Sequence, residues 1–131
     1  MPVRRRLRSL VSQHWQSGAN SSPIFELMVW LSYSRADLWI GYTPIAKDVY
    51  VGGYRWNAFQ TASTNAVFVP TANPLDVDDA NLNLMDFIDE IVSRNLGISP
   101  SWYLSSVEFG IEVYKGRGTL HVTSYDVTVE P

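Results

Sequence analysis

The chain has 131 residues, enough for one hydrophobic core, and its hydrophobic (46%) and charged (18%) contents are those of an ordinary globular domain. Its formal net charge is −3, and removing the four arginines among the first eight residues leaves −7 on the remainder, which argues against a nucleic-acid interface on the folded body. No run approaches the roughly 18 apolar residues that cross a bilayer, and the absence of cysteine excludes disulfides and thiolate metal sites.

The first 22 residues show no regular hydrophobic period and end in the loop-like stretch QSGANSSP. They also lack the apolar segment of a secretory signal behind their charged start. The sequence therefore predicts a poorly ordered basic arm over residues 1–22 and an ordered domain over residues 23–131. In this interpretation His14 is a polar residue of the arm.

Strands dominate the first half of the ordered domain. Residues 24–32 are apolar except for Glu26 and the terminal Ser32, which predicts a buried strand. Residues 48–59 predict a hairpin, because Gly52 and Gly53 can adopt the positive φ angles of a two-residue turn. Residues 66–71 predict a further short strand that ends at Pro70.

One helix is predicted, over residues 81–97. Asn83 can cap its N-terminus, Gly97 can end it, and Glu90 and Arg94 form an i, i+4 pair on the polar face. Its apolar residues recur at helical spacing, so we expect the helix to pack on the outside of a sheet. Just before it, Asp76, Asp78 and Asp79 do not fit the spacing of a calcium-binding loop, which favours a solvated acidic loop.

Two strands are predicted at the C-terminal end, over residues 102–114 and 119–130. In the second, the apolar residues change from even to odd positions, which predicts a bulge near Thr123 or a strand covered on both faces. His121 reads as a polar residue on the outer face of this strand. Trp56 and Trp102 read as core or strand-end packing rather than as sugar platforms.

Alternation along two of these strands separates an apolar face from a carboxylate-bearing face. In residues 24–32 the face opposite the core carries Glu26, Met28 and Trp30, and in residues 102–114 it carries Glu108 and Glu112. If the two strands are neighbours, Glu26 and Glu112 can face each other across a groove, as the paired carboxylates of glycosidases do. The alternative is that both are solvent-facing residues of antiparallel strands.

At these residues the sequence resembles glycoside hydrolase family 12, the endoglucanases and xyloglucan-specific endoglucanases. FELMVWL is similar to the nucleophile strand of that family, VEFGIEVY to its acid/base strand, and VYVGGYRW, LMDFIDEIV and GTLHVTSYDVTV follow in the family's order. The resemblance implies an all-β, concanavalin-like β-jelly-roll sandwich with one packed helix. The strands that the family places N-terminally are not recognised here, which suggests an N-terminally truncated chain.

The resemblance also implies a function. Glu26 corresponds to the nucleophile and Glu112 to the acid/base of a retaining endo-β-1,4-glucanase, while Met28, Trp30 and Glu108 would contact substrate. The implied partner is cellulose or xyloglucan, with a proteinaceous inhibitor as a further partner, no metal or other cofactor, and an extracellular location.

Two features depart from the family pattern. Ile111 and Val113 flank Glu112 where the family has Thr and Pro, and no acidic residue precedes the nucleophile strand, where the family places an Asp against the nucleophile. The alternative functions are a catalytically inactive truncated paralogue that binds glucan or an inhibitor protein, and an unrelated β-sandwich lectin.

Overall fold

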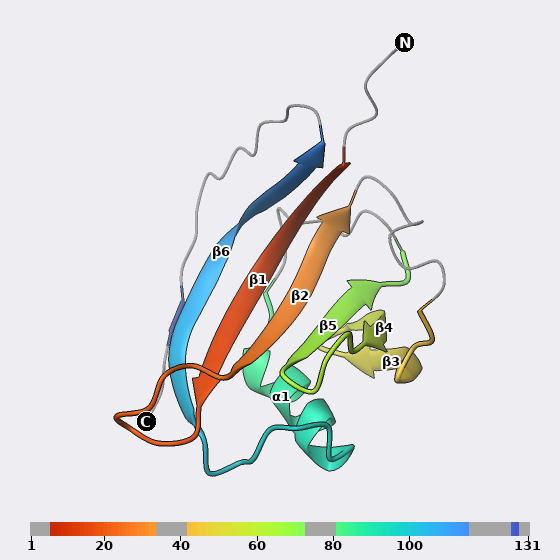
Figure 1. The fold of residues 1–131 in the computed structure, drawn as a ribbon. Coiled ribbons are helices and arrows are strands. Elements are labelled where there is room, and N and C mark those ends of the chain that lie inside the picture. The colour runs from red at the N-terminus through yellow and green to blue at the C-terminus, as the bar shows by residue number, and fades with distance from the viewer. Residues whose placement is uncertain (1–5, 34–41, 73–80, 116–126, 129–131) are drawn as a thin grey trace.

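The computed structural model describes residues 6–33, 42–72, 81–115 and 127–128, and for residues 6–11 and 112–115 it describes the backbone. These residues form one six-stranded sheet and one helix (Figure 1). In chain order the elements are β1 (Arg6–Gln16), β2 (Phe25–Tyr33), β3 (Ala46–Val51), β4 (Tyr54–Phe59), β5 (Asn65–Pro70), α1 (Leu84–Ser93) and β6 (Tyr103–Lys115). The all-β class with one packed helix is confirmed.

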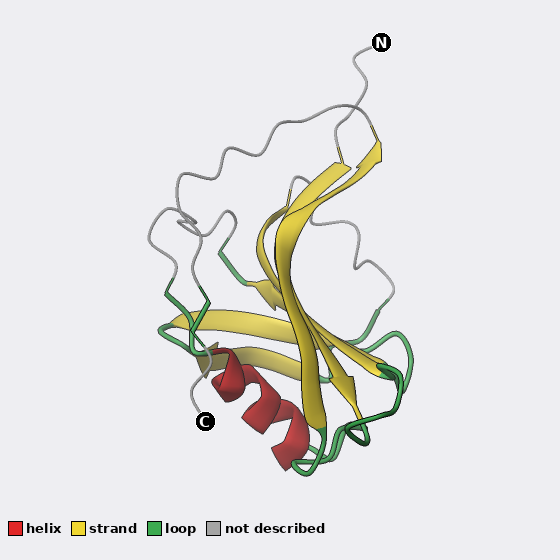
Figure 2. Cartoon of the chain, turned by 90° about the vertical axis from the view of Figure 1, so that its left-hand side faces the viewer, coloured by secondary structure: helices red, strands yellow, loops and turns green. Residues whose placement is uncertain are grey.

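The sheet is mixed. Its strand order is β3-β4-β5-β2-β1-β6, and every neighbouring pair is antiparallel except β2 and β5, which are parallel. Figure 2 shows that the sheet is strongly twisted and that α1 lies beneath one of its faces. A parallel neighbour requires a crossover connection, and here the hairpin β3–β4 lies between β2 and β5 in the sequence.

The prediction of a disordered arm over residues 1–22 is wrong for Arg6–Gln16, which form β1. This strand lies between β2 and β6, so its backbone can hydrogen-bond on both edges, and Gln13 and Trp15 are buried with 1% and 6% of their surface exposed. The alternation in VSQHW is hidden because the buried position 13 holds a polar residue. Tertiary pairing therefore orders a segment with weak hydrophobic periodicity.

The face of the sheet that α1 covers holds the main core. Leu27, Val29 and Phe68 are each no more than 1% exposed there. Phe87 of α1 stands edge-on against Phe68 and against Trp56, with ring centroids 5.0 and 5.2 Å apart. Because edge-to-face aromatic pairs add to the burial of apolar surface, these contacts fix the helix on the sheet. The expected packing of the helix and of Trp56 is confirmed.

The predicted turn and cap are also present. Gly52 and Gly53 have φ angles of 62° and 89° in the tight turn between β3 and β4. The side chain of Asn83 accepts a hydrogen bond from the backbone N–H of Met85 at the start of α1. The helix ends earlier than expected, at Ser93, because Asn95 takes a left-handed conformation with φ 56°.

Of the predicted strand over residues 119–130 only residues 127–128 are described, and these two are not in a strand. The predicted bulge near Thr123, His121 and the acidic loop with Asp76, Asp78 and Asp79 lie outside the described residues. Within the described part, the single helix is too short and too polar to cross a membrane.

Candidate active site

The register of three neighbouring strands, β2, β1 and β6, determines which side chains meet on the face opposite α1. In one row across the sheet Glu26 pairs with His14, and His14 pairs with Ser106. In the next row Met28 pairs with Ser12, and Ser12 pairs with Glu108. Side chains of directly opposed residues point to the same face, so these rows place two carboxylates, an imidazole and a hydroxyl side by side.

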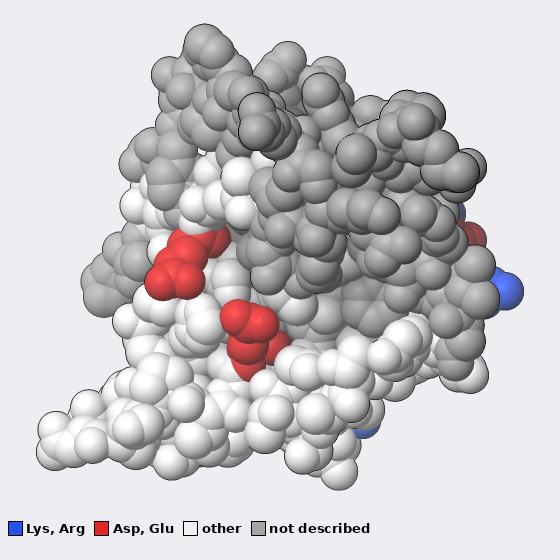
Figure 3. All heavy atoms as spheres, turned by 45° about the horizontal axis from the view of Figure 1, so that its top comes forward, with Lys and Arg blue, Asp and Glu red and all other residues white. Residues whose placement is uncertain are grey.

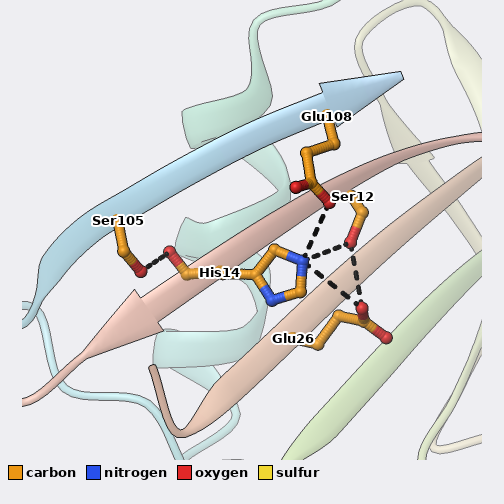
Figure 4. Close-up of polar contacts among 5 residues, drawn as sticks. All are labelled: Ser12, His14, Glu26, Ser105 and Glu108. Atoms are coloured by element: carbon orange, nitrogen blue, oxygen red, sulfur yellow. Dashed lines mark hydrogen bonds and ion pairs between the residues drawn. The ribbon is translucent and has the colours of Figure 1, made fainter. Parts of the chain in front are cut away.

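Four of these side chains form a connected polar cluster (Figure 4). Ser12 Oγ donates a hydrogen bond to Glu26 Oε2 at 3.1 Å and lies 3.3 Å from His14 Nε2. The same imidazole nitrogen lies 3.5 Å from Glu26 Oε2 and 3.3 Å from Glu108 Oε2. The imidazole of β1 therefore links the carboxylate of β2 to that of β6.

Exposure varies across the cluster. The side chain of His14 is 28% exposed, that of Glu26 39% and that of Glu108 67%, whereas Ser12 is buried. Solvent screens the contact between His14 and Glu108, so this pair adds little to stability. Ser12 is buried, so water competes little for the hydroxyl that it donates to the partly exposed carboxylate of Glu26.

An open hollow of about 360 Å³ borders the cluster. Its lining is made by residues of β1, of the start of β2 and of the turn before β5: His14, Pro23, Ile24, Phe25, Glu26 and Thr64. On the face shown in Figure 3, acidic side chains are exposed near the centre of the described surface and the coloured basic atoms lie towards its rim.

The two carboxylates of the cluster lie close together. Because Glu26 Oε2 and Glu108 Oε2 both lie within 3.5 Å of one nitrogen, these oxygens are at most about 7 Å apart, against about 5 to 5.5 Å between the carboxyl groups of retaining glycosidases. The described part of the chain holds no group of three or more His, Asp or Glu side chains arranged to bind a metal ion.

Two of the predicted substrate-contacting residues differ in their surroundings. Met28 is half-buried on the same face as Glu26. Trp30, expected at the sugar-facing surface, is fully buried, so that expectation is wrong. The reason is that β5 and β4 contribute a second apolar cluster on this face, and Trp30 packs into it with Phe59, Val67, Val69 and Tyr33.

The strands that carry Glu26 and Glu112 are not neighbours, contrary to the expectation from the sequence, because β1 lies between them. The backbone of Glu112 pairs with Arg8, six positions along β6 from Ser106 in the row of Glu26. At about 3.3 Å per residue this offset is roughly 20 Å along the strand. The side chain of Glu112 lies outside the described side chains.

The sequence analysis did not place His14 and Ser12 in the cluster, because it assigned both to the arm. The available signal was the alternation of polar Ser12, His14 and Gln16 in the stretch read as an arm. Ser12 also makes the contact for which the resemblance required an Asp, since its hydroxyl reaches the carboxylate of Glu26. The contacts to the carboxylate of Glu26 thus come from Ser12 and His14 of β1.

A twisted mixed sheet with one packed helix, and with carboxylates grouped on its open face, defines the class as an all-β protein with an acidic open face. The family model for glycosyl hydrolase family 12 matches residues 11–130, and the chain belongs to this family. The match begins inside β1, which agrees with β1 being an integral strand of the sheet.

Two relatives show the same family. The chain is 33% identical over 119 residues to Endoglucanase S of Pectobacterium parmentieri, a match covering 85% of this chain and 43% of the relative. It is 31% identical over 112 residues to Xyloglucan-specific endo-beta-1,4-glucanase A of Emericella nidulans, covering 80% of this chain and 44% of the relative. The chain therefore spans a little under half the length of these relatives.

Solved structures of family 12 enzymes have the same fold as this chain. The crystal structure of a metagenome-derived glycoside hydrolase family 12 endoglucanase is 30% identical, with a TM-score of 0.71 over 86% of this chain and 50% of that one. A family 12 xyloglucanase from Bacillus licheniformis, at 24% identity, has the same fold with a TM-score of 0.67 over 86% of this chain and 51% of its own.

Proposed function

We propose that this chain carries the nucleophile of a retaining endo-β-1,4-glucanase that hydrolyses cellulose-like β-glucan or xyloglucan. The observation that carries this proposal is the carboxylate of Glu26, which is held by the buried hydroxyl of Ser12 and lies near a second carboxylate on an open face. The substrate class is supported by the names of two relatives, an endoglucanase and a xyloglucan-specific endo-beta-1,4-glucanase.

The proposed reaction has two displacements. In the first, an oxygen of Glu26 bonds to the anomeric carbon while the glycosidic C–O bond breaks, and the leaving oxygen takes a proton from the acid/base. In the second, water attacks the same carbon, the acid/base recovers a proton from that water, and the ester bond to Glu26 breaks. The sugar leaves with its original anomeric configuration.

Two glutamates of β6, Glu108 and Glu112, are candidates for the acid/base. We assign this role to Glu112, as the resemblance of VEFGIEVY to the acid/base strand of the family implies. One observation favours Glu108 instead, because its carboxylate shares the imidazole of His14 with Glu26. Glu108 lies in the register described above beside His14, whereas the backbone of Glu112 lies about 20 Å further along β6 from the row of Glu26.

Kinetics on two kinds of substrate test the proposal. Hydrolysis of soluble β-glucan and of xyloglucan should disappear in Glu26→Gln. The variant that lacks the acid/base carboxylate should lose activity on glucan. It should still be glycosylated by a dinitrophenyl cellobioside, because this leaving group needs no proton, and added azide should restore its turnover. Azide rescue of Glu112→Gln supports our assignment, and rescue of Glu108→Gln instead transfers the role to Glu108.

The alternative is a chain that binds glucan or an inhibitor protein without turnover. It would be supported if β-glucan bound equally well to the original chain and to Glu26→Gln while neither released reducing sugar. Since polymeric glucan does not cross membranes, the proposed activity also implies that the protein works outside the cell. Detection of the protein in the culture medium would test this location.

A further inference from the structure

We infer that His14 is a positioning residue for Glu26, acting through the hydroxyl of Ser12. This inference rests on the proposed role of Glu26 as nucleophile. It assigns to β1 a contribution to the site that neither composition nor motif pattern indicated. The side chains involved come from two neighbouring strands and meet at two oxygens and one nitrogen (Figure 4).

The direction of the hydrogen bonds follows from chemistry. A carboxylate only accepts, so Ser12 Oγ uses its proton on Glu26 Oε2 at 3.1 Å. That leaves the hydroxyl oxygen as an acceptor for His14 Nε2, 3.3 Å away. The chain of donors therefore runs from the imidazole to the hydroxyl to the carboxylate.

The remaining neighbours of the imidazole nitrogen agree with this direction. Glu26 Oε2 and Glu108 Oε2 lie 3.5 and 3.3 Å from Nε2, and both oxygens accept hydrogen bonds. All three groups around this nitrogen therefore favour a proton on it. We conclude that neutral His14 carries its proton on Nε2 rather than on Nδ1.

The backbone makes this arrangement rigid. His14 is directly opposite Glu26 in the antiparallel ladder, and β1 is paired along both of its edges. The hydroxyl of Ser105 donates to the backbone carbonyl of His14 at 2.8 Å, which adds a contact from β6. Ser12 is 5% exposed, so water competes little for its hydroxyl.

The consequence concerns one oxygen of Glu26. Both contacts fall on Oε2, so the carboxylate cannot rotate freely about its terminal torsion, and Oε1 becomes the oxygen available for attack. A nucleophile that is already oriented loses less entropy on the way to the transition state. Glu108 contacts the imidazole from mostly exposed surroundings and is not required for this role.

A spectroscopic test reads the network without relying on activity. The chain has two histidines, so His121→Gln leaves only the His14 signals in long-range proton–nitrogen spectra. At a pH where the imidazole is neutral, the proton should be on Nε2, and the ring signals should move in Ser12→Ala and Glu26→Gln but not in the distant control Ser101→Ala. A proton on Nδ1, or signals indifferent to both site variants, would overturn the inference.

A labelling test reads the consequence for the nucleophile. 2,4-Dinitrophenyl 2-deoxy-2-fluoro-β-cellobioside should label Glu26, and because its leaving group needs no acid, the rate reports on the nucleophile alone. Ser12→Ala and His14→Ala should each slow labelling about tenfold, the effect of losing one hydrogen bond to a charged group, while His14→Gln should retain most of the rate because its amide nitrogen can donate from a similar position.

The outcomes separate the two proposals. Labelling of Glu26 at the original rate in both alanine variants would overturn the positioning role and leave the nucleophile assignment intact. If the original chain takes no label, the assignment of Glu26 as nucleophile fails. The position of the imidazole proton in the spectra then tests whether His14 donates to Ser12, independently of any reaction.

Discussion

Gln13 provides the sharpest test of the packing around β1. Its side chain is 1% exposed on the face of the sheet that also buries Trp15, and its amide nitrogen has no hydrogen-bond partner among the described residues. A buried amide without a partner costs about 1 to 3 kcal/mol. Met has nearly the same length and shape but no polar group to satisfy.

We therefore expect Gln13→Met to raise the free energy of unfolding by about 1 to 2 kcal/mol, since the desolvation cost disappears and the volume is unchanged. The measurement is urea unfolding of the two chains, followed by tryptophan fluorescence. The midpoint should rise without a change in the slope m, because the surface exposed on unfolding stays similar.

The matched control is the same substitution three residues along β1. The amide of Gln16 donates to the carbonyls of Gly18 and Ala19 at 3.0 and 3.1 Å, so Gln16→Met should lower the free energy of unfolding by up to about 1 kcal/mol. Equal or lower stability of Gln13→Met would refute the reasoning, because it would mean that the buried amide is satisfied.

Three further predictions concern other parts of the fold. Gly97→Ala should lower the free energy of unfolding by about 2 to 3 kcal/mol, because φ is 106° and a Cβ would lie 2.6 Å from the carbonyl oxygen of Ser63. Gly53→Ala is the control, and it should lower this free energy by about 1 kcal/mol because the space around Gly53 is open. Urea unfolding compares the two variants. Phe87→Ala should cost about 3 to 5 kcal/mol in the same assay, because it removes a fully buried ring from the core. Burial raises the pKa of Tyr33 above 10.0, so its contribution to stability is fully present below about pH 10 and is lost as the pH rises through the folded-state value. Unfolding midpoints between pH 8 and 12 should therefore fall less steeply for Tyr33→Phe, and parallel curves for the two chains would contradict the pKa shift.

The sequence predicted the local structure correctly where it depends on the conformational preference of single residues. Gly52 and Gly53 predict their turn because few other residues adopt positive φ, and Asn83 predicts the start of α1 because its side chain can replace a missing backbone acceptor. The alternation in β2 likewise identifies Leu27 and Val29 as core residues, because burial on one face repeats every second residue.

The errors arose where distant strands decide the outcome. No local pattern shows that β1 enters the sheet between β2 and β6, so the sequence placed His14 in an arm and made Glu26 and Glu112 neighbours across one groove. The error at Trp30 has the same cause. Alternation assigns the side chain to the correct face of the sheet, but it cannot show that residues of β4 and β5 cover that part of the face.

The position of β1 between β2 and β6 also sets the time at which the site can form during synthesis. His14 and Ser105, which join β1 to β6, are separated by 91 residues, so the ribosome needs roughly 5 to 20 s to release the second after the first. Throughout that interval one edge of β1 has no partner from β6. Nascent chains are therefore most exposed to wrong strand pairing before β6 emerges, and slower translation of that segment would lengthen the time for which this edge of β1 is open.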